Sequence, residues 1–241
     1  DNGIVERLQA EGDRSPADLV MTVDIANLEQ IVAAGVVQPV DSAILTAAIP
    51  ATLRSPDNLW FALTTRARIV YASKERVADG EVTTYEDLAS EEWRGRICTR
   101  PGTHNYNLAL MSAMIAHHGE DYARDWAAGL RANLAHKPEG NDRAQVRSIW
   151  AGECDISLGN TYYMGQMLAD PAQVEWANSV RIIFPTFEGG GTHVNVSGAG
   201  VLRNAPHREN ARKFLEYLAG NDAQRYFADG NNEWPVVASV A

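Results

Sequence analysis

Two adjacent tyrosines, Tyr162 and Tyr163, follow an apolar segment, residues 154–158, that is predicted to be a strand. Past the end of a strand, in a first helical turn, neighbouring side chains lie about 100° apart and can converge on one point. Either Asn160 or Thr161 could cap that helix. A phenolate is a hard anionic oxygen donor that suits Fe³⁺, and a trivalent ion can displace the phenol proton despite its usual pKa of about 10. Alternatively, both rings belong to the core or its rim.

A second candidate segment is the loop of residues 99–107, which follows one predicted strand and precedes a predicted helix. Tyr106 lies where a third phenol could approach the same site. The alternative is that its ring packs apolar side chains at the start of the helix. Arg100 and His104 are weaker candidates, because a histidine in a loop is more often solvated than bound to a metal.

Two arginines, Arg66 and Arg68, lie two residues apart in a predicted strand and therefore share one face of it. A guanidinium beside a ferric ion held by phenolates could bind a carbonate-type anion through two parallel hydrogen bonds. The alternative is a solvated or ion-paired strand end, which we favour for Arg68. The sequence contains no pattern typical of a zinc site, a nucleotide-binding P-loop or a nucleophile elbow.

Composition limits the partners of the chain. Its formal net charge of −10 argues against nucleic acid, which requires a basic surface. Apolar residues make up 45% of its 241 residues, enough for an ordinary core in one large domain or two lobes. No apolar run approaches the ~18–20 residues that span a bilayer.

Predicted strands and helices alternate along the chain, which indicates a mostly parallel sheet with helices on both faces. Ligands of such sheets bind beyond the carboxyl ends of the strands, where the tyrosines lie. The spacing of Ile4, Val5 and Leu8 predicts a helix at the beginning, so residues that precede it in the mature protein are expected to be missing. The main predicted strands are residues 17–23, 60–63, 67–71, 96–100, 154–158 and 181–184, and the main helices are 25–34, 121–130, 143–150 and 208–218.

Together these segments resemble the periplasmic ferric-ion-binding proteins of bacterial ABC iron importers, a branch of the type II periplasmic binding protein fold. The resemblance extends over almost the whole chain, and the Asn-x-Tyr-Tyr motif of residues 160–163 carries it most strongly. The other matching segments are residues 15–24, 65–71, 93–97, 141–146, 191–198 and 233–236.

The resemblance implies that Tyr162 and Tyr163 are ferric ligands. One subgroup adds a tyrosine that matches Tyr106 and an arginine, matching Arg66, that binds a carbonate-type anion. Another subgroup uses a carboxylate at the position of Asp24, together with phosphate. We favour the tyrosine-rich subgroup, because Tyr106 is present and Asp24 is one methylene shorter than the expected glutamate. A further His or Tyr ligand of the family lies on a strand that precedes this sequence.

The resemblance also implies an α/β protein of two lobes, with hinge strands and a cleft between the lobes. The first lobe would comprise residues 1–70 plus 190–235, and the second residues 71–189 plus 236–241. The tyrosines belong to the second lobe, over which the first would close. Cys98 and Cys154 lie in strands expected to be neighbours. In an oxidising periplasm they could form a disulfide, and two buried thiols are the alternative.

We therefore expect a monomeric periplasmic protein, not an enzyme, that binds Fe³⁺ with carbonate or bicarbonate and delivers it to the permease of an ABC transporter. Its signal peptide would already have been removed. One alternative is a binding protein of the same fold for an organic anion or amine. An enzyme on this architecture ranks last, because the sequence offers no nucleophile with a base and an orienting group.

Overall fold

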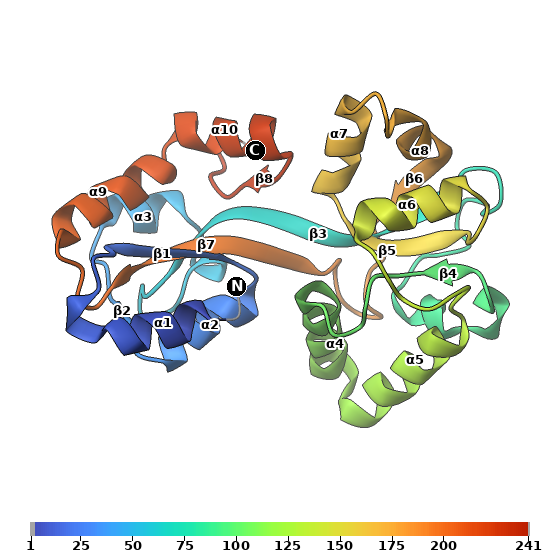
Figure 1. The fold of residues 1–241 in the computed structure, drawn as a ribbon, viewed down its shortest axis with the longest axis horizontal. Helices are drawn as coiled ribbons and strands as arrows, with labels where there is room; N and C mark the ends of the chain where they lie inside the picture. The colour runs from blue at the N-terminus through green and yellow to red at the C-terminus, as the bar shows by residue number, and fades with distance from the viewer. Residues whose placement is uncertain (1–2, 241) are drawn as a thin grey trace. The chain divides into compact units, whose positions relative to one another are not determined.

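The computed structural model describes residues 3–240, which form two compact units (Figure 1). Unit 1 contains the residues up to Thr65 and those from Asn195 on, and unit 2 contains residues 66–194. The chain passes between the units inside two long strands, β3 (Phe61–Ser73) and β7 (Val194–Leu202). The crossings therefore lie at residues 65/66 and 194/195, compared with the expected positions near 70 and 190.

The assignment of residues 236–241 to the second lobe is wrong for their described part. Val236 and Val237 are buried in the core of unit 1. The N–H of Val236 donates to Oε1 of the fully buried Gln224, at 2.8 Å. The same glutamine donates to the carbonyl oxygens of Leu63 and Leu218, so one side chain fixes the C-terminal segment to unit 1.

Unit 1 is a sheet with helices on both sides. In Figure 1, α1 and α2 lie on one side of its strands, and α3, α9 and α10 on the other. Leu28, Ile31, Phe61 and Leu215 are among the fully buried side chains of its core. Besides its parts of β3 and β7, the unit contains α1 (Ile4–Glu11), β1 (Leu19–Val23), α2 (Ile25–Ala33), β2 (Val37–Gln38), α3 (Ala43–Ala48), α9 (Arg208–Leu218), α10 (Asn221–Asn231) and β8 (Trp234–Pro235), with 3-10 turns at Gly12–Arg14 and Ala51–Leu53.

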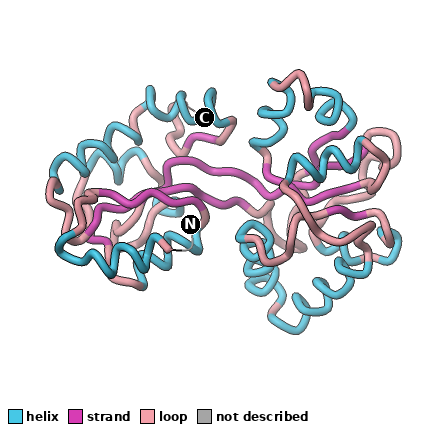
Figure 2. Tube along the Cα trace, in the orientation of Figure 1, coloured by secondary structure: helices cyan, strands magenta, loops and turns pink. Residues whose placement is uncertain are grey.

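Unit 2 has a separate core on each face of its strands. Leu110, Met114 and Trp126 belong to the core under α4 and α5, whereas Val146 and Met167 belong to the core under α6, α7 and α8. The two helix groups lie on opposite sides of the strands in Figures 1 and 2. The unit contains β4 (Ile97–Cys98), α4 (Asn105–His118), α5 (Glu120–Ala132), α6 (Asp142–Trp150), β5 (Ile156–Asn160), α7 (Tyr162–Ala169), α8 (Val174–Ser179) and β6 (Val180–Ile183), with 3-10 turns at Glu86–Ala89 and Glu91–Trp93.

The strand pairing corrects the expectation of a mostly parallel sheet. Of the strand pairs with a described register, β4 with β5 is parallel. In contrast, β1 and β2 pair antiparallel with β7, and β5, β6 and β8 pair antiparallel with β3. Helical connections keep β5 and β6 running in the same direction. However, β3 comes from an earlier part of the chain and lies between them in the opposite direction, because Val70 pairs with both Leu158 and Ile183.

Strand β3 is longer than the sequence suggests. Apart from residue 60, the predicted strands 60–63 and 67–71 are parts of one strand of 13 residues, all of them buried. Burial includes both Arg66 and Arg68, each 2% exposed. Among the described residues, no helix is both long and apolar enough to cross a membrane.

Candidate metal-binding site

The three candidate tyrosines form one cluster in unit 2. The hydroxyl oxygens of Tyr106 and Tyr162 are 3.0 Å apart, although 56 residues separate them in the chain. The rings of Tyr162 and Tyr163 pack against each other with their centroids 4.3 Å apart. Tyr106 lies in the first turn of α4, and the other two residues begin α7.

The strand-to-helix turn before Tyr162 is fixed to β3. Neither Asn160 nor Thr161 caps α7 with its side chain, contrary to the prediction. Instead, Oδ1 of Asn160 accepts a hydrogen bond from Nη1 of Arg68 at 3.1 Å. Oγ1 of Thr161 accepts one from the N–H of Ala67 at 3.3 Å. Both side chains therefore hold the turn on the neighbouring strand.

Polar side chains also hold the loop that carries Tyr106. His104 is the N-cap of α4, and its Nδ1 accepts a hydrogen bond from the N–H of Tyr106 at 3.2 Å. The rings of these two residues meet edge to face, with centroids 4.6 Å apart. Asn107 donates to Oγ1 of Thr99 and accepts from Nη2 of Arg68 at 2.6 Å. His104 and Asn107 thus orient Tyr106 from both sides.

A buried carboxylate, Asp142, lies beside the tyrosine cluster. Its Oδ1 is 3.1 Å from Nη1 of Arg100, and its Oδ2 is 2.9 Å from Nη1 of Arg68. Oδ2 also accepts a hydrogen bond from the N–H of Asn160 at 3.0 Å. Arg68 is therefore ion-paired, and it is buried and not solvated. Sequence reasoning assigned no role to Asp142, although two buried arginines on one strand require an acidic partner.

Positive charge surrounds the ring of Tyr106. The guanidinium carbons of Arg100, Arg66 and Arg68 lie 5.0, 5.8 and 5.9 Å from its centroid. Burial raises the pKa of Tyr106 above its ordinary value, while the hydrogen bond to Tyr162 and the charge of Arg66 oppose that rise. A cation beside a phenol favours its ionised form, so the arginines lower the cost of forming a phenolate here.

The pKa of Tyr162 is also raised, chiefly by burial and then by the nearby Tyr106. Both phenols are consequently protonated at neutral pH until an ion displaces their protons. Nearby, burial and then the charges of Arg68 and Arg66 lower the pKa of His193 to about 4, so its imidazole is neutral at pH 7.

Comparison with known proteins assigns the chain to a family. The model of the bacterial extracellular solute-binding proteins matches residues 14–241. The chain belongs to this family. Its members bind and carry solutes, so the family is one of transport proteins and not of enzymes.

Individual relatives of this solute-binding protein are named for iron. Iron uptake protein A2 of Synechocystis sp. is 51% identical over 241 residues, which cover 98% of this chain and 70% of that protein. The crystal structure of apo ferric ion-binding protein A of Pasteurella haemolytica matches with a TM-score of 0.95 and 45% identity, over 100% of this chain and 76% of that one. A Trichodesmium protein (IdiA, FutA) in complex with iron and citrate ligands matches with a TM-score of 0.94 and 45% identity. This match covers 100% of this chain and 77% of that one. These matches confirm the type II periplasmic binding protein fold.

Asp24, the minor candidate of the resemblance, lies in unit 1 of the solute-binding protein. One carboxylate oxygen accepts from the N–H of Ala26 at 3.0 Å and caps α2. The other accepts from Nδ2 of Asn195, also at 3.0 Å. The side chain is fully buried and its φ is +81°, so these bonds hold a backbone conformation that few residues other than glycine adopt. This geometry assigns Asp24 a structural role within unit 1.

The two cysteines form a disulfide in unit 2. The Cα atoms of Cys98 and Cys154 are 5.9 Å apart, and the bridge joins the end of β4 to the segment that leads into β5. Because Tyr162 follows β5, the bridge helps to fix the strand that positions the tyrosine pair.

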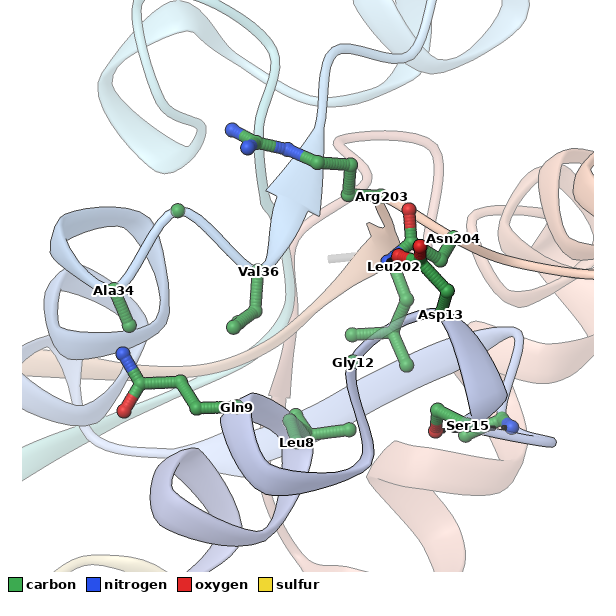
Figure 3. Close-up of a pocket in the computed structure, with 12 residues that line it drawn as sticks. Leu8, Gln9, Gly12, Asp13, Ser15, Ala34, Val36, Leu202, Arg203 and Asn204 are labelled. Atoms are coloured by element: carbon green, nitrogen blue, oxygen red, sulfur yellow. Dashed lines mark hydrogen bonds between the residues drawn. The ribbon is translucent and has the colours of Figure 1, made fainter.

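Two pockets of the solute-binding protein contain none of the three tyrosines. A pocket of about 290 Å³ in unit 1 is bordered by Leu8, Val36 and Arg203 (Figure 3). A second, mostly apolar pocket of about 420 Å³ is lined by residues of α4 and α5, including Leu110 and Trp126. Among residues 3–240, no cluster of three or more His, Cys, Asp or Glu side chains could hold a metal. The tyrosine cluster is therefore the metal-binding candidate in the described part of the chain.

Proposed function

We propose that this protein binds Fe³⁺ in the periplasm and delivers it to the permease of an ABC importer, with Tyr106, Tyr162 and Tyr163 as phenolate ligands. Relatives with 51% and 45% identity are named for iron uptake and ferric ion binding. Within this chain, the three candidate tyrosines predicted from sequence lie together in unit 2.

The single observation that carries the proposal is the 3.0 Å distance between the hydroxyl oxygens of Tyr106 and Tyr162. In octahedral sites with metal–oxygen bonds of about 2 Å, adjacent ligand oxygens are about 3 Å apart. Two phenolates at this separation can therefore bind one ion without a large movement. Fe³⁺ favours such hard anionic oxygens, and its charge supplies the energy that displaces the phenol protons.

Charge balance favours an anion bound together with the ion. Three phenolates neutralise the charge of Fe³⁺. Beside the cluster, the buried Arg68 and Arg100 share the single carboxylate of Asp142, so this group leaves one positive charge. A carbonate-type anion held by Arg66 would offset this excess, because a guanidinium binds planar oxyanions through two parallel hydrogen bonds. Citrate is a second candidate, since it accompanies iron in the Trichodesmium relative.

Absorption spectroscopy tests the proposal. Titration with Fe³⁺ as a weak chelate should produce a visible phenolate-to-iron band, measured without added anion, with bicarbonate and with citrate. Tyr106→Phe, Tyr162→Phe and Tyr163→Phe should each weaken the band and lower the iron affinity at least tenfold, because each removes one anionic ligand. Tyr226→Phe is the matched control, since this side chain is 73% exposed in α10 of unit 1 and should leave both unchanged.

The alternative ligand is an organic anion. Three guanidiniums within 6 Å of the Tyr106 ring centroid favour an anion over an amine, because an amine would be repelled. Wild-type protein that binds citrate but gives no band with Fe³⁺ would replace the ferric proposal with this one.

A further inference from the structure

The tyrosines of the cluster come from two separate segments, and one buried carboxylate is bonded to both. Asp142 is 0% exposed and lies in the first turn of α6. Its two oxygens meet three donors: Nη1 of Arg100, Nη1 of Arg68 and the N–H of Asn160. Both carboxylate oxygens of Asp142 therefore accept hydrogen bonds inside unit 2.

Each of these three donors lies in, or is hydrogen-bonded to, a segment that carries tyrosines of the cluster. Asn160 ends β5, two residues before Tyr162. The hydrogen bond from its N–H to Asp142 therefore fixes the position of the turn that carries the tyrosine pair. Arg100 lies in the loop that carries Tyr106. Arg68 reaches that loop by a second route, because its Nη2 donates to Oδ1 of Asn107, which adjoins Tyr106.

We infer that Asp142 is a positioning residue of the ferric site, which sets the separation of Tyr106 from Tyr162. It acts through Arg100, Arg68 and Asn160 and does not itself bind the ion. The inference rests on the proposed function, and it adds a residue that neither the motif nor the tyrosine cluster identifies.

A carboxylate is required at this position because all three neighbours donate. The amide of Asp142→Asn offers one oxygen and one NH₂ group, so its NH₂ group must face a donor. The single oxygen accepts the most hydrogen bonds when it faces Arg68 and the N–H of Asn160, because each of these groups donates one. The NH₂ group then faces Arg100, so the substitution releases mainly the loop of Tyr106 and leaves β5 in place.

The test is a double-mutant cycle for iron affinity with Asp142→Asn and Tyr106→Phe. Asp142→Asn should weaken Fe³⁺ binding about 10–100-fold, the range typical when a group that orients a metal ligand is changed. In the Tyr106→Phe background the same substitution should cost less than about threefold, since the tyrosine that it misplaces is already removed. Equal losses in both backgrounds, or wild-type affinity of Asp142→Asn, would overturn the inference.

Asp155→Asn is the matched control. Asp155 is also a carboxylate of unit 2 between two arginines, Arg76 and Arg96, but it lies before β5 at the opposite end from the tyrosines. Its substitution should leave iron affinity within about twofold of the wild type. If Asp142→Asn does not fold, Arg100→Gln replaces it in the cycle. The Arg100→Gln change removes the ion pair between Asp142 and the Tyr106 loop and leaves Asp142 paired with Arg68.

Amide hydrogen exchange of the iron-free protein separates this inference from the proposed function. Asp142→Asn should speed exchange of the amides in the Tyr106 loop, which its bond to Arg100 restrains. Unchanged exchange there would overturn the positioning role whether or not iron binds. A wild type that binds no Fe³⁺ would overturn the proposed function, and the exchange result would still decide what Asp142 does.

Discussion

At the scale of single residues, the partner of the hydroxyl group distinguishes the tyrosines of the core from the candidate metal ligands. Tyr71 and Tyr85 are completely buried, and their hydroxyls donate to the backbone carbonyls of Asn160 and Arg68. Tyr106 and Tyr162 are less buried, and their hydroxyls face each other. A phenol bonded to a carbonyl is satisfied and has to remain protonated, whereas two facing phenols can exchange their protons for a cation.

This difference leads to a prediction for alkaline solution. Burial raises the pKa of Tyr71, Tyr85 and Tyr162 well above the ordinary value of about 10. Above that pH the unfolded chain binds fewer protons than the folded one. The stability is therefore complete below about pH 10 and falls as the pH rises, by up to about 1.4 kcal/mol per pH unit for each tyrosine.

Urea unfolding at a series of pH values measures this loss, and ultraviolet absorbance follows phenolate formation. The denatured protein, in which all eight tyrosines should titrate together, is the control. If the folded protein titrated completely without unfolding, these hydroxyls would be accessible and the expectation would be wrong.

At the scale of elements, the end of β5 depends on a glycine. A Cβ atom at Gly159 would lie 2.2 Å from Cε2 of Tyr71, which is too close for any real contact. The Tyr71 ring covers the strand at this point, and its hydroxyl bonds to the carbonyl of the next residue, Asn160, at 2.7 Å. Strand, ring and turn are therefore packed as one piece immediately before Tyr162.

Gly159→Ala should accordingly destabilise the protein by about 1–3 kcal/mol, as overpacking of a core does, and should also weaken iron binding. Gly230→Ala is the control, because Gly230 lies in α10 with nothing within 4 Å of its added methyl group. That variant should gain up to about 1 kcal/mol from helix propensity. The urea midpoints of the two variants, measured side by side, show whether stability falls in Gly159→Ala and rises in Gly230→Ala. Equal midpoints would contradict the packing argument.

At the scale of the whole molecule, each unit has its own core, and the disulfide belongs to unit 2 alone. The bridge joins residues 56 positions apart, so it closes a long loop that contains Tyr106. Loop-closure entropy predicts that such a bridge stabilises the folded state by about 2–4 kcal/mol.

Cys98→Ala/Cys154→Ala should lower the free energy of unfolding by that amount, and dithiothreitol should have the same effect on the wild type. Denaturant unfolding with and without the reductant measures both. The double variant is its own control, since dithiothreitol should not change its stability. An equal effect of dithiothreitol on the variant would show that the reductant acts elsewhere.

The sequence by itself determined the types and local positions of the candidate ligands, because these depend on short-range patterns. Strand ends and helix starts near Tyr106 and Tyr162 follow from apolar runs and turn residues, and these elements lie close to where they were predicted. The family motif, read in order along the chain, indicated the type II fold that the comparisons confirm.

Only the tertiary structure decided what joins these elements. The antiparallel position of β3 between β5 and β6, the packing of Val236 in unit 1 and the bonds of Asp142 all link residues far apart in the chain. Local periodicity carries no information about such partners. Which donors a buried carboxylate meets is fixed by the packing of several elements together, and that packing places Tyr106 beside Tyr162.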